Sequence, residues 1–237
     1  MVIRVMVEGG VMSSDPTFSP EFNGIIQRNS AALRESLNGF FSRALGQNDI
    51  EIKVSVASGF KAAAKMFISQ TEDDFLYVDL DDSPDHRQSW FDNLQKDSII
   101  FPKERCDVVC FWIPEMEAWF LKQPACLEKW AASESILLKK GAVIADDNNI
   151  KGKDIERLQH KPSSVLNTLF SRYFISSTLD RRGKPKKIVY GKLRHAPSII
   201  GFLDAHKMLQ QDNELSRFVS MVNDMKNQIV TDSKTNK

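Results

Sequence analysis

Short apolar runs divide the first half of the chain. Residues 2–7 are apolar except for Arg4, and residues 50–56 alternate apolar with polar side chains, as a half-buried strand does. Residues 75–78 are a compact apolar run of the kind that fills a buried parallel strand, and residues 107–113, which are apolar after Asp107, make the fourth strand. The pattern therefore predicts four strands.

Helical spacing separates these runs. Two sets of apolar residues recur every three or four positions: Leu33, Leu37, Phe40, Phe41 and Ala44, then Ala62, Ala63, Met66 and Phe67. A polar segment at 13–20 leads to the first set, and residues 114–117 combine Pro with acids as a helix start does. Strands alternating with helices predict an α/β fold with a mostly parallel four-stranded sheet flanked by helices.

The pattern changes after Trp130. Helical spacing dominates at 165–173, 199–209 and 215–229. We expect an α/β domain over 1–130, a helical C-terminal extension over 131–230 that packs on it, and a polar, frayed tail at 231–237.

Composition places the chain among ordinary globular proteins. Of its 237 residues, 42% are hydrophobic and 27% charged, which is enough for a sizeable core. No apolar run approaches the roughly 18–20 residues of a membrane span, and no signal peptide precedes the first strand, so we expect a cytoplasmic protein. Cys106, Cys110 and Cys126 lack paired spacing and are expected to be core thiols.

A local excess of basic residues stands out against the net charge of +1. The stretch contains Arg181, Arg182, Lys184, Lys186, Lys187, Lys192 and Arg194. Such a stretch attracts a phosphate-rich partner, although a solvated loop is an equal alternative.

Acidic residues follow two of the predicted strands. Glu8 comes after the first strand, and Asp79 and Asp81 come after the third. Because ligands bind outside the carboxyl ends of parallel strands, these acids are expected to converge on one crevice. Three ionised carboxylates need a compensating cation, and hard oxygen ligands suit Mg²⁺. The alternative is that the two aspartates are solvated loop residues that cap the next helix.

Four segments carry a family resemblance. They are Val7-Glu8-Gly9-Gly10, Ser58-Gly59-Phe60-Lys61 with Ala64 and Phe67, Val78-Asp79-Leu80-Asp81, and Met116-Glu117-Ala118-Trp119-Phe120-Leu121. The first and third resemble the Toprim signature, in which a Glu and an Asp-x-Asp pair bind Mg²⁺. Together the four resemble the Toprim-like family DUF4276 over residues 2–130, with a weaker echo at 190–195. The chain departs from the family in its longer Ser/Pro loop after residue 10, and in Asp81, where the family often has Glu.

The resemblance implies a Toprim-like, Rossmann-like fold and Mg²⁺- or Mn²⁺-dependent cleavage of phosphodiester bonds. The metal ligands it implies are Glu8, Asp79 and Asp81. Lys192 is the candidate for neutralising charge on the pentavalent phosphorane; the alternative is that it is one of many cations in a basic loop. Of Glu115 and Glu117, only one is expected to face the metal, and the resemblance favours Glu117.

Other roles follow from the same resemblance. The candidate phosphate or nucleic-acid contacts are Lys61, Arg194 and His195. Related Toprim nucleases of the overcoming-lysogenization-defect type work with ABC-like or AAA-like ATPases in defence against phages. The resemblance thus implies nucleic acid as partner, DNA in preference to RNA, an ATPase as a second partner, and a capacity to form oligomers.

Two other functions fit parts of the pattern. A haloacid-dehalogenase-like phosphatase would use Asp79 as nucleophile and Asp81 as acid/base, but it gives Glu8 no role. A non-catalytic Toprim-like subunit would dock on an ATPase and use its acids only to bind metal or support the fold.

Overall fold

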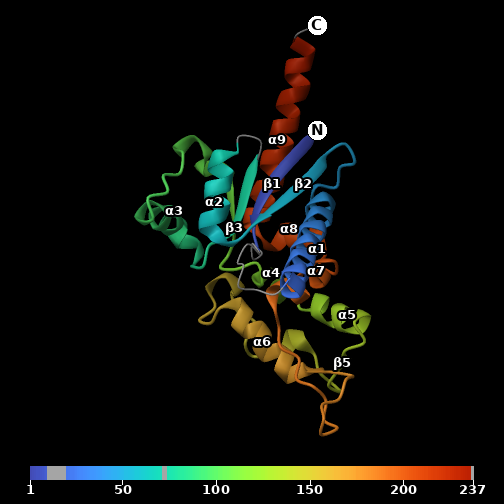
Figure 1. Ribbon diagram of the computed structural model, residues 1–237. Helices are drawn as coiled ribbons and strands as arrows, with labels where there is room; N and C mark the ends of the chain where they lie inside the picture. Colours follow the sequence, from blue (N-terminus) through green and yellow to red (C-terminus); the bar gives the residue numbers. More distant parts are fainter. Residues whose placement is uncertain (10–19, 71–73, 236–237) are drawn as a thin grey trace.

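Four parallel strands form the central sheet (Figure 1). The computed structural model describes residues 1–9, 20–70 and 74–235. The strands are β1 (Val2–Glu8), β2 (Glu51–Ala57), β3 (Phe75–Asp79) and β4 (Val109–Trp112), and their order across the sheet is β2-β1-β3-β4. The predicted α/β class and parallel four-stranded sheet are confirmed. Gly10 and the predicted polar loop up to residue 19 lie outside the described residues.

The strand register brings two acidic chain positions to one edge. Val7 of β1 pairs with Tyr77 of β3 in a parallel ladder, so the strand ends that follow, Glu8 and Asp79, leave the sheet side by side. Asp79 in turn pairs with Trp112 of β4. The carboxyl edge of the sheet therefore gathers the ends of three neighbouring strands.

Side chains of the sheet alternate between two apolar layers. On one side, Met6, Leu76 and Val78 pack beneath α2 (Gly59–Ser69) and α3 (Arg87–Lys96). The opposite side is the larger core, covered by α1 (Pro20–Leu45) and by helices from the second half of the chain (Figure 1). Both faces of the sheet are thus covered, as an all-parallel sheet requires.

The second half of the chain is mainly helical. Its helices are α4 (Ala118–Lys122), α5 (Ala125–Ser133), α6 (Pro162–Tyr173), α7 (Lys192–Ile200), α8 (Ala205–Gln211) and α9 (Asn213–Thr235). A small antiparallel ladder joins β5 (Leu137–Leu138) to β6 (Phe174–Ile175). Short 3-10 helices lie at Pro84–His86, Lys103–Val108, Ile144–Asp146 and Ile155–Arg157. The helix expected over 199–209 is divided in two, because α7 ends at Ile200 and Asp204 caps α8 by accepting the Lys207 N–H at 3.0 Å.

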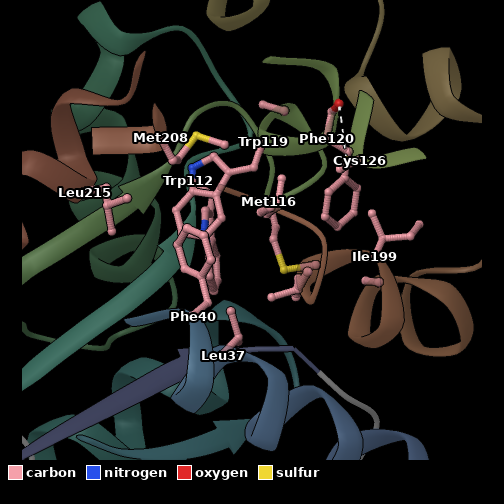
Figure 2. Packing of buried hydrophobic residues seen from close by; sticks show 14 of the residues in the cluster. Leu37, Phe40, Trp112, Met116, Trp119, Phe120, Cys126, Ile199, Met208 and Leu215 are labelled. Atoms are coloured by element: carbon pink, nitrogen blue, oxygen red, sulfur yellow. Dashed lines mark hydrogen bonds between the residues drawn. The ribbon is translucent and has the colours of Figure 1, made fainter. Parts of the chain in front are cut away.

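Aromatic rings connect this second half to the sheet. Trp119 of α4 lies 4.8 Å from Phe40 of α1 and 5.8 Å from Trp112 of β4, measured between ring centroids (Figure 2). Phe218 of α9 lies 5.0 Å from Phe75 of β3. These contacts belong to one continuous apolar cluster, so the helical part shares the core of the α/β part.

Helix α9 also bonds to the backbone of β4, the last strand of the sheet. The Glu214 carboxylate accepts the Phe111 N–H at 3.0 Å, and Arg217 donates to the carbonyl of Val109. Arg87 of α3 donates to the same carbonyl and pairs with Glu214 at 2.6 Å. Side chains thereby satisfy backbone groups of β4 that no further strand of the described residues pairs.

The expected core thiols are free cysteines. Cys110 and Cys126 are buried and Cys106 is half-buried. Burial raises the pKa of the Cys110 thiol to about 12, so the group stays protonated and behaves as a small apolar side chain. Among the described helices, none combines the length and apolar character needed to cross a membrane.

Candidate active site

Glu8 and Asp79 meet at the carboxyl edge of the sheet. The Glu8 carboxylate accepts the backbone N–H of Asp79 at 3.2 Å, and only 8% of Asp79 is exposed. Gly9 permits α1 to pack closely at this edge, since a Cβ at residue 9 would lie 2.8 Å from the Leu33 side chain of α1. The small residue after β1 therefore lets the first helix pack tightly beside the two acids.

Asp79 is held at both carboxylate oxygens. Oδ1 accepts the Met116 N–H at 2.8 Å, from the segment that follows β4. Oδ2 accepts from the ammonium of Lys192 at 2.5 Å. Lys192 is the first residue of α7, where the helix dipole disfavours a cation, so its placement depends on the acids that face it.

Glu117 is the third carboxylate of the cluster. Its side chain is buried, with 1% of the residue exposed. One oxygen accepts the Tyr190 hydroxyl at 2.9 Å, and the other lies 3.8 Å from the ammonium of Lys192. Asp79 and Glu117 thus share one ammonium, and Glu8 lies against Asp79.

Burial governs the protonation of these groups. It raises the pKa of Glu8 to about 7, and the neighbouring Asp79 charge adds to the effect. Burial also raises the pKa of Glu117 to about 7, with the Lys192 charge opposing it, and raises that of Asp79. Burial alone would lower the pKa of Lys192, but the carboxylates of Asp79 and Glu117 outweigh it and raise the value. The ammonium of Lys192 therefore stays protonated, and its single positive charge faces the carboxyl groups of Glu8, Asp79 and Glu117.

Asp81 lies at the exposed border of the carboxylate cluster. Its backbone has φ = 59°, its side chain is 56% exposed, and its carboxylate pairs with Lys161 at 2.7 Å. Lys161 also lies 3.6 Å from Glu115. Asp81 is nevertheless close enough for its charge to raise the pKa of Glu8 and of Asp79. The predicted Asp-x-Asp pair thus divides between the buried cluster and its exposed border.

The two glutamates after β4 separate as expected from their spacing. Glu117 enters the cluster, whereas Glu115 accepts the Ser163 N–H at 3.0 Å, at the start of α6. A carboxylate at that position is favoured by the helix dipole. Glu117 thus lies in the carboxylate cluster and Glu115 at the start of α6, and which of the two faces a metal stays a prediction.

A pocket of about 240 Å³ opens beside the cluster. Its lining residues are Glu115, Glu117, Ser163, Asn167, Tyr190 and Lys192. Asn167 positions one wall by accepting the Tyr190 N–H at 3.0 Å. A polar group of a substrate could thus reach Lys192 and Glu117 from this side.

The three candidate phosphate contacts occupy different surroundings. Lys61 pairs with Asp97 at 2.8 Å on the α2 side of the sheet. Arg194 is exposed on α7.

His195 is buried, and its ring centroid lies 5.5 Å from that of Trp130. The His195 ring accepts the Gly191 N–H at 2.9 Å through Nδ1, which makes it part of the helix start. Burial, helped by the Arg194 charge, lowers the pKa of His195 to about 4, so the imidazole is neutral at physiological pH. These contacts describe a packing residue and give no support to a phosphate contact.

Two residues of the site were not singled out from the sequence. Tyr190 orients Glu117, and Lys161 neutralises Asp81 and approaches Glu115. Tyr190 could have been found from the sequence, because it lies two residues before Lys192 inside the 190–195 segment that carries the family resemblance. Nothing in the sequence around Lys161 distinguishes it from other surface lysines.

Comparison with known proteins gives no assignment. No protein-family model, curated protein or solved structure matches the chain. The site must therefore be interpreted from its own contacts.

The donor atoms of the cluster suit a hard divalent cation. Within the described ranges, no three acidic, histidine or cysteine side chains are already arranged around a common point for a metal ion. In the cluster, Lys192 supplies the cation that contacts Asp79 and Glu117. The other charged groups of the cluster are the carboxylates of Glu8, Asp79 and Glu117, and carboxylate oxygens are the ligands that Mg²⁺ and Mn²⁺ prefer.

Proposed function

We propose that the protein is a Mg²⁺- or Mn²⁺-dependent, Toprim-like nuclease that hydrolyses phosphodiester bonds. The observation that supports this most directly is the contact between Glu8 and Asp79 at the ends of neighbouring parallel strands, with Glu117 and Lys192 beside them. Buried carboxylates with raised pKa values, gathered around one ammonium, are typical of a functional site.

Charge balance favours a divalent ion. When Glu8, Asp79 and Glu117 are ionised, their three negative charges face the single positive charge of Lys192, which leaves a net charge of −2. Glu8 and Asp79 would hold the ion, with Glu117 or Asp81 as a further ligand. A bound Mg²⁺ or Mn²⁺ would polarise the phosphate and lower the pKa of a water molecule.

The chain's own residues supply the remaining roles. Lys192 can neutralise charge that develops on the phosphate, because its raised pKa keeps the ammonium charged throughout the working range. Tyr190 holds Glu117 in one orientation through its hydroxyl. The Met116 N–H does the same for Asp79, so the acids are preorganised by groups that do not titrate near neutral pH.

The sequence-based expectations about context belong to the same proposal. They are DNA as substrate in preference to RNA, a cytoplasmic location, an ABC- or AAA-type ATPase partner, and a role as effector in defence against phages. An ATPase docked on the chain could control access to the pocket beside Glu117.

One competing function shares Asp79. A phosphatase that uses Asp79 as nucleophile is consistent with the Lys192 contact, since a lysine can neutralise a phosphoryl group. It does not account for Glu8, whose carboxylate is half-buried against the Asp79 backbone. Glu8 therefore separates the two functions.

The test uses the purified chain with labelled DNA and RNA, in Mg²⁺, in Mn²⁺ and in chelator, alone and with the product of any ATPase gene that neighbours its own. We expect metal-dependent cleavage that falls at least about 100-fold in Asp79→Asn and in Glu8→Gln. Glu134→Gln, which changes an exposed acid directly after α5, is the matched control and should cleave like the wild type.

Three results would overturn the nuclease proposal. Full activity in Glu8→Gln would remove the observation that supports it. An acid-stable phosphoenzyme on Asp79 would instead establish a phosphatase. Inactivity on every substrate, also with the ATPase present, would point to a non-catalytic subunit.

A further inference from the structure

A basic arm extends from the end of the molecule opposite the C-terminal helix. Residues 176–189 leave β6, turn back and return to Tyr190, and Figure 1 shows this orange segment projecting beyond α6 and β5. Leu179 and Pro185 form an antiparallel bridge, and the Lys186 N–H donates to the Thr178 carbonyl at 2.9 Å. These backbone bonds make the arm a short hairpin with a defined shape.

The arm carries cations without local partners. They are Arg181, Arg182, Lys184, Lys186 and Lys187. Within the part of the chain that the structure describes, none of the five has a carboxylate within salt-bridge distance. The single acid of the arm, Asp180, instead accepts the backbone N–H groups of residues 182 and 184 at 2.8 and 2.9 Å. All five cations are exposed.

Two further lysines lie at the root of the arm. Lys139 and Lys140 follow β5, whose ladder with β6 brings them next to the start of the arm. The Lys139 N–H donates to the Tyr173 carbonyl at 2.9 Å, and both lysine side chains are exposed. We call the five arm cations together with these two lysines the basic arm surface.

The composition of the arm indicates which chemistry it recognises. Residues 176–189 contain no aromatic ring on which a base could stack. Flexible lysines and arginines without local carboxylates attract phosphates in a way that does not depend on base sequence. The arm also leads directly into Tyr190 and Lys192, which line the pocket beside the carboxylate cluster.

We propose that the basic arm surface binds the sugar-phosphate backbone of the nucleic acid and guides it to the candidate active site. This rests on the proposed nuclease function and adds the surface by which the substrate is held. The contact is electrostatic, is independent of sequence, and weakens steeply with salt.

The experiment measures binding separately from cleavage. Fluorescence anisotropy of a labelled DNA duplex of about 30 base pairs is followed against the full-length protein in chelator, at several salt concentrations. The test variant is Lys184→Gln/Lys186→Gln/Lys187→Gln. The control, Lys65→Gln/Lys96→Gln/Lys103→Gln, changes the net charge equally on the α2 and α3 side. All six residues are exposed, and thermal melts verify that both variants fold.

The arm variant should bind the DNA roughly 10- to 100-fold more weakly near 0.15 M salt. The slope of log binding constant against log salt concentration should become less steep by about 2 to 3, because each lost phosphate contact reduces its magnitude by about 0.9. The control should bind within about twofold of the wild type.

Equal weakening in both variants would overturn the proposal, since net charge alone would then explain binding. Polyglutamate and an unrelated DNA are also added as competitors at equal concentrations of negative charge. If polyglutamate displaces the labelled DNA as well as the unrelated DNA does, the proposal is overturned in favour of an acidic protein partner. Binding through the arm without cleavage in any metal would uphold this surface while refuting the nuclease function, so the two failures are distinguishable.

Discussion

Replacing Glu117 by Gln should stabilise the metal-free protein at alkaline pH. Glu117 is buried against Tyr190 and near Lys192, and its pKa rises from 4.5 to about 7. Because each pH unit is worth about 1.4 kcal/mol, ionising this group in the folded state costs at most about 3 kcal/mol. Gln cannot ionise, and its amide oxygen can still accept the Tyr190 hydroxyl.

The sign of the effect follows from proton binding. The folded state holds the Glu117 proton more tightly than the unfolded chain does, so the free energy of unfolding falls as pH rises from about 4.5 to about 7. Above about pH 7 the full cost is present, and below about pH 4.5 it is absent. Glu117→Gln should therefore exceed the wild type by up to about 3 kcal/mol at pH 8 and match it near pH 4. Glu8 retains its own pH dependence, so the slope is reduced rather than abolished.

Urea unfolding followed by tryptophan fluorescence, in chelator and between pH 4 and 8, measures this difference. Glu104→Gln is the control, because that side chain is exposed and should leave the curve unchanged. If Glu117→Gln follows the wild-type slope, or is the less stable protein at pH 8, the inferred cost of burying this carboxylate is refuted.

Three further predictions concern the same core and site. Lys192→Met removes the ammonium that Asp79 and Glu117 share, so it should lower the free energy of unfolding at pH 8 by about 3 kcal/mol, less at pH 5, in the same urea assay. Mg²⁺ at ten times its Kd should raise the Tm of the wild type at pH 8 by about 4 °C in differential scanning fluorimetry. Glu117→Gln should reduce this Tm shift more than Asp81→Asn does. The reverse order would assign the third metal ligand to Asp81. Phe218→Ala should cost about 3–5 kcal/mol in urea unfolding, because the ring packs against β3; a loss under about 1 kcal/mol would mean that α9 is not part of the core.

The sheet was predictable because its signals are local. Each strand is a compact apolar run, and the acids that follow β1 and β3 lie where parallel strands place their carboxyl ends. The adjacency of Glu8 and Asp79 therefore followed from topology alone. The turn that separates α7 from α8 also had a signal, since Gly201 and Asp204 are residues that end and begin helices.

The rest of the site depends on long-range packing. Asp81 was expected to converge with Glu8 and Asp79 on one crevice. The chain turns at its positive φ and directs the carboxylate to Lys161, eighty residues later. Whether Asp81 reaches a metal stays a prediction. The side chain of His195 packs against the rings of Trp130, Phe170 and Tyr190. These residues are far from one another in the sequence, so no local pattern predicts that they surround the imidazole.

The bonds from Glu214 and Arg217 to the backbone of β4 have a consequence for shortened forms of the chain. A protein ending before α9 would lose the carboxylate that accepts the Phe111 N–H and one of the two guanidinium groups that donate to the Val109 carbonyl, so the outer border of β4 would present an unpaired N–H. Such a border is a template for a strand of another molecule. We therefore expect α9 to shield this border from pairing with another chain, and its removal to favour aggregates.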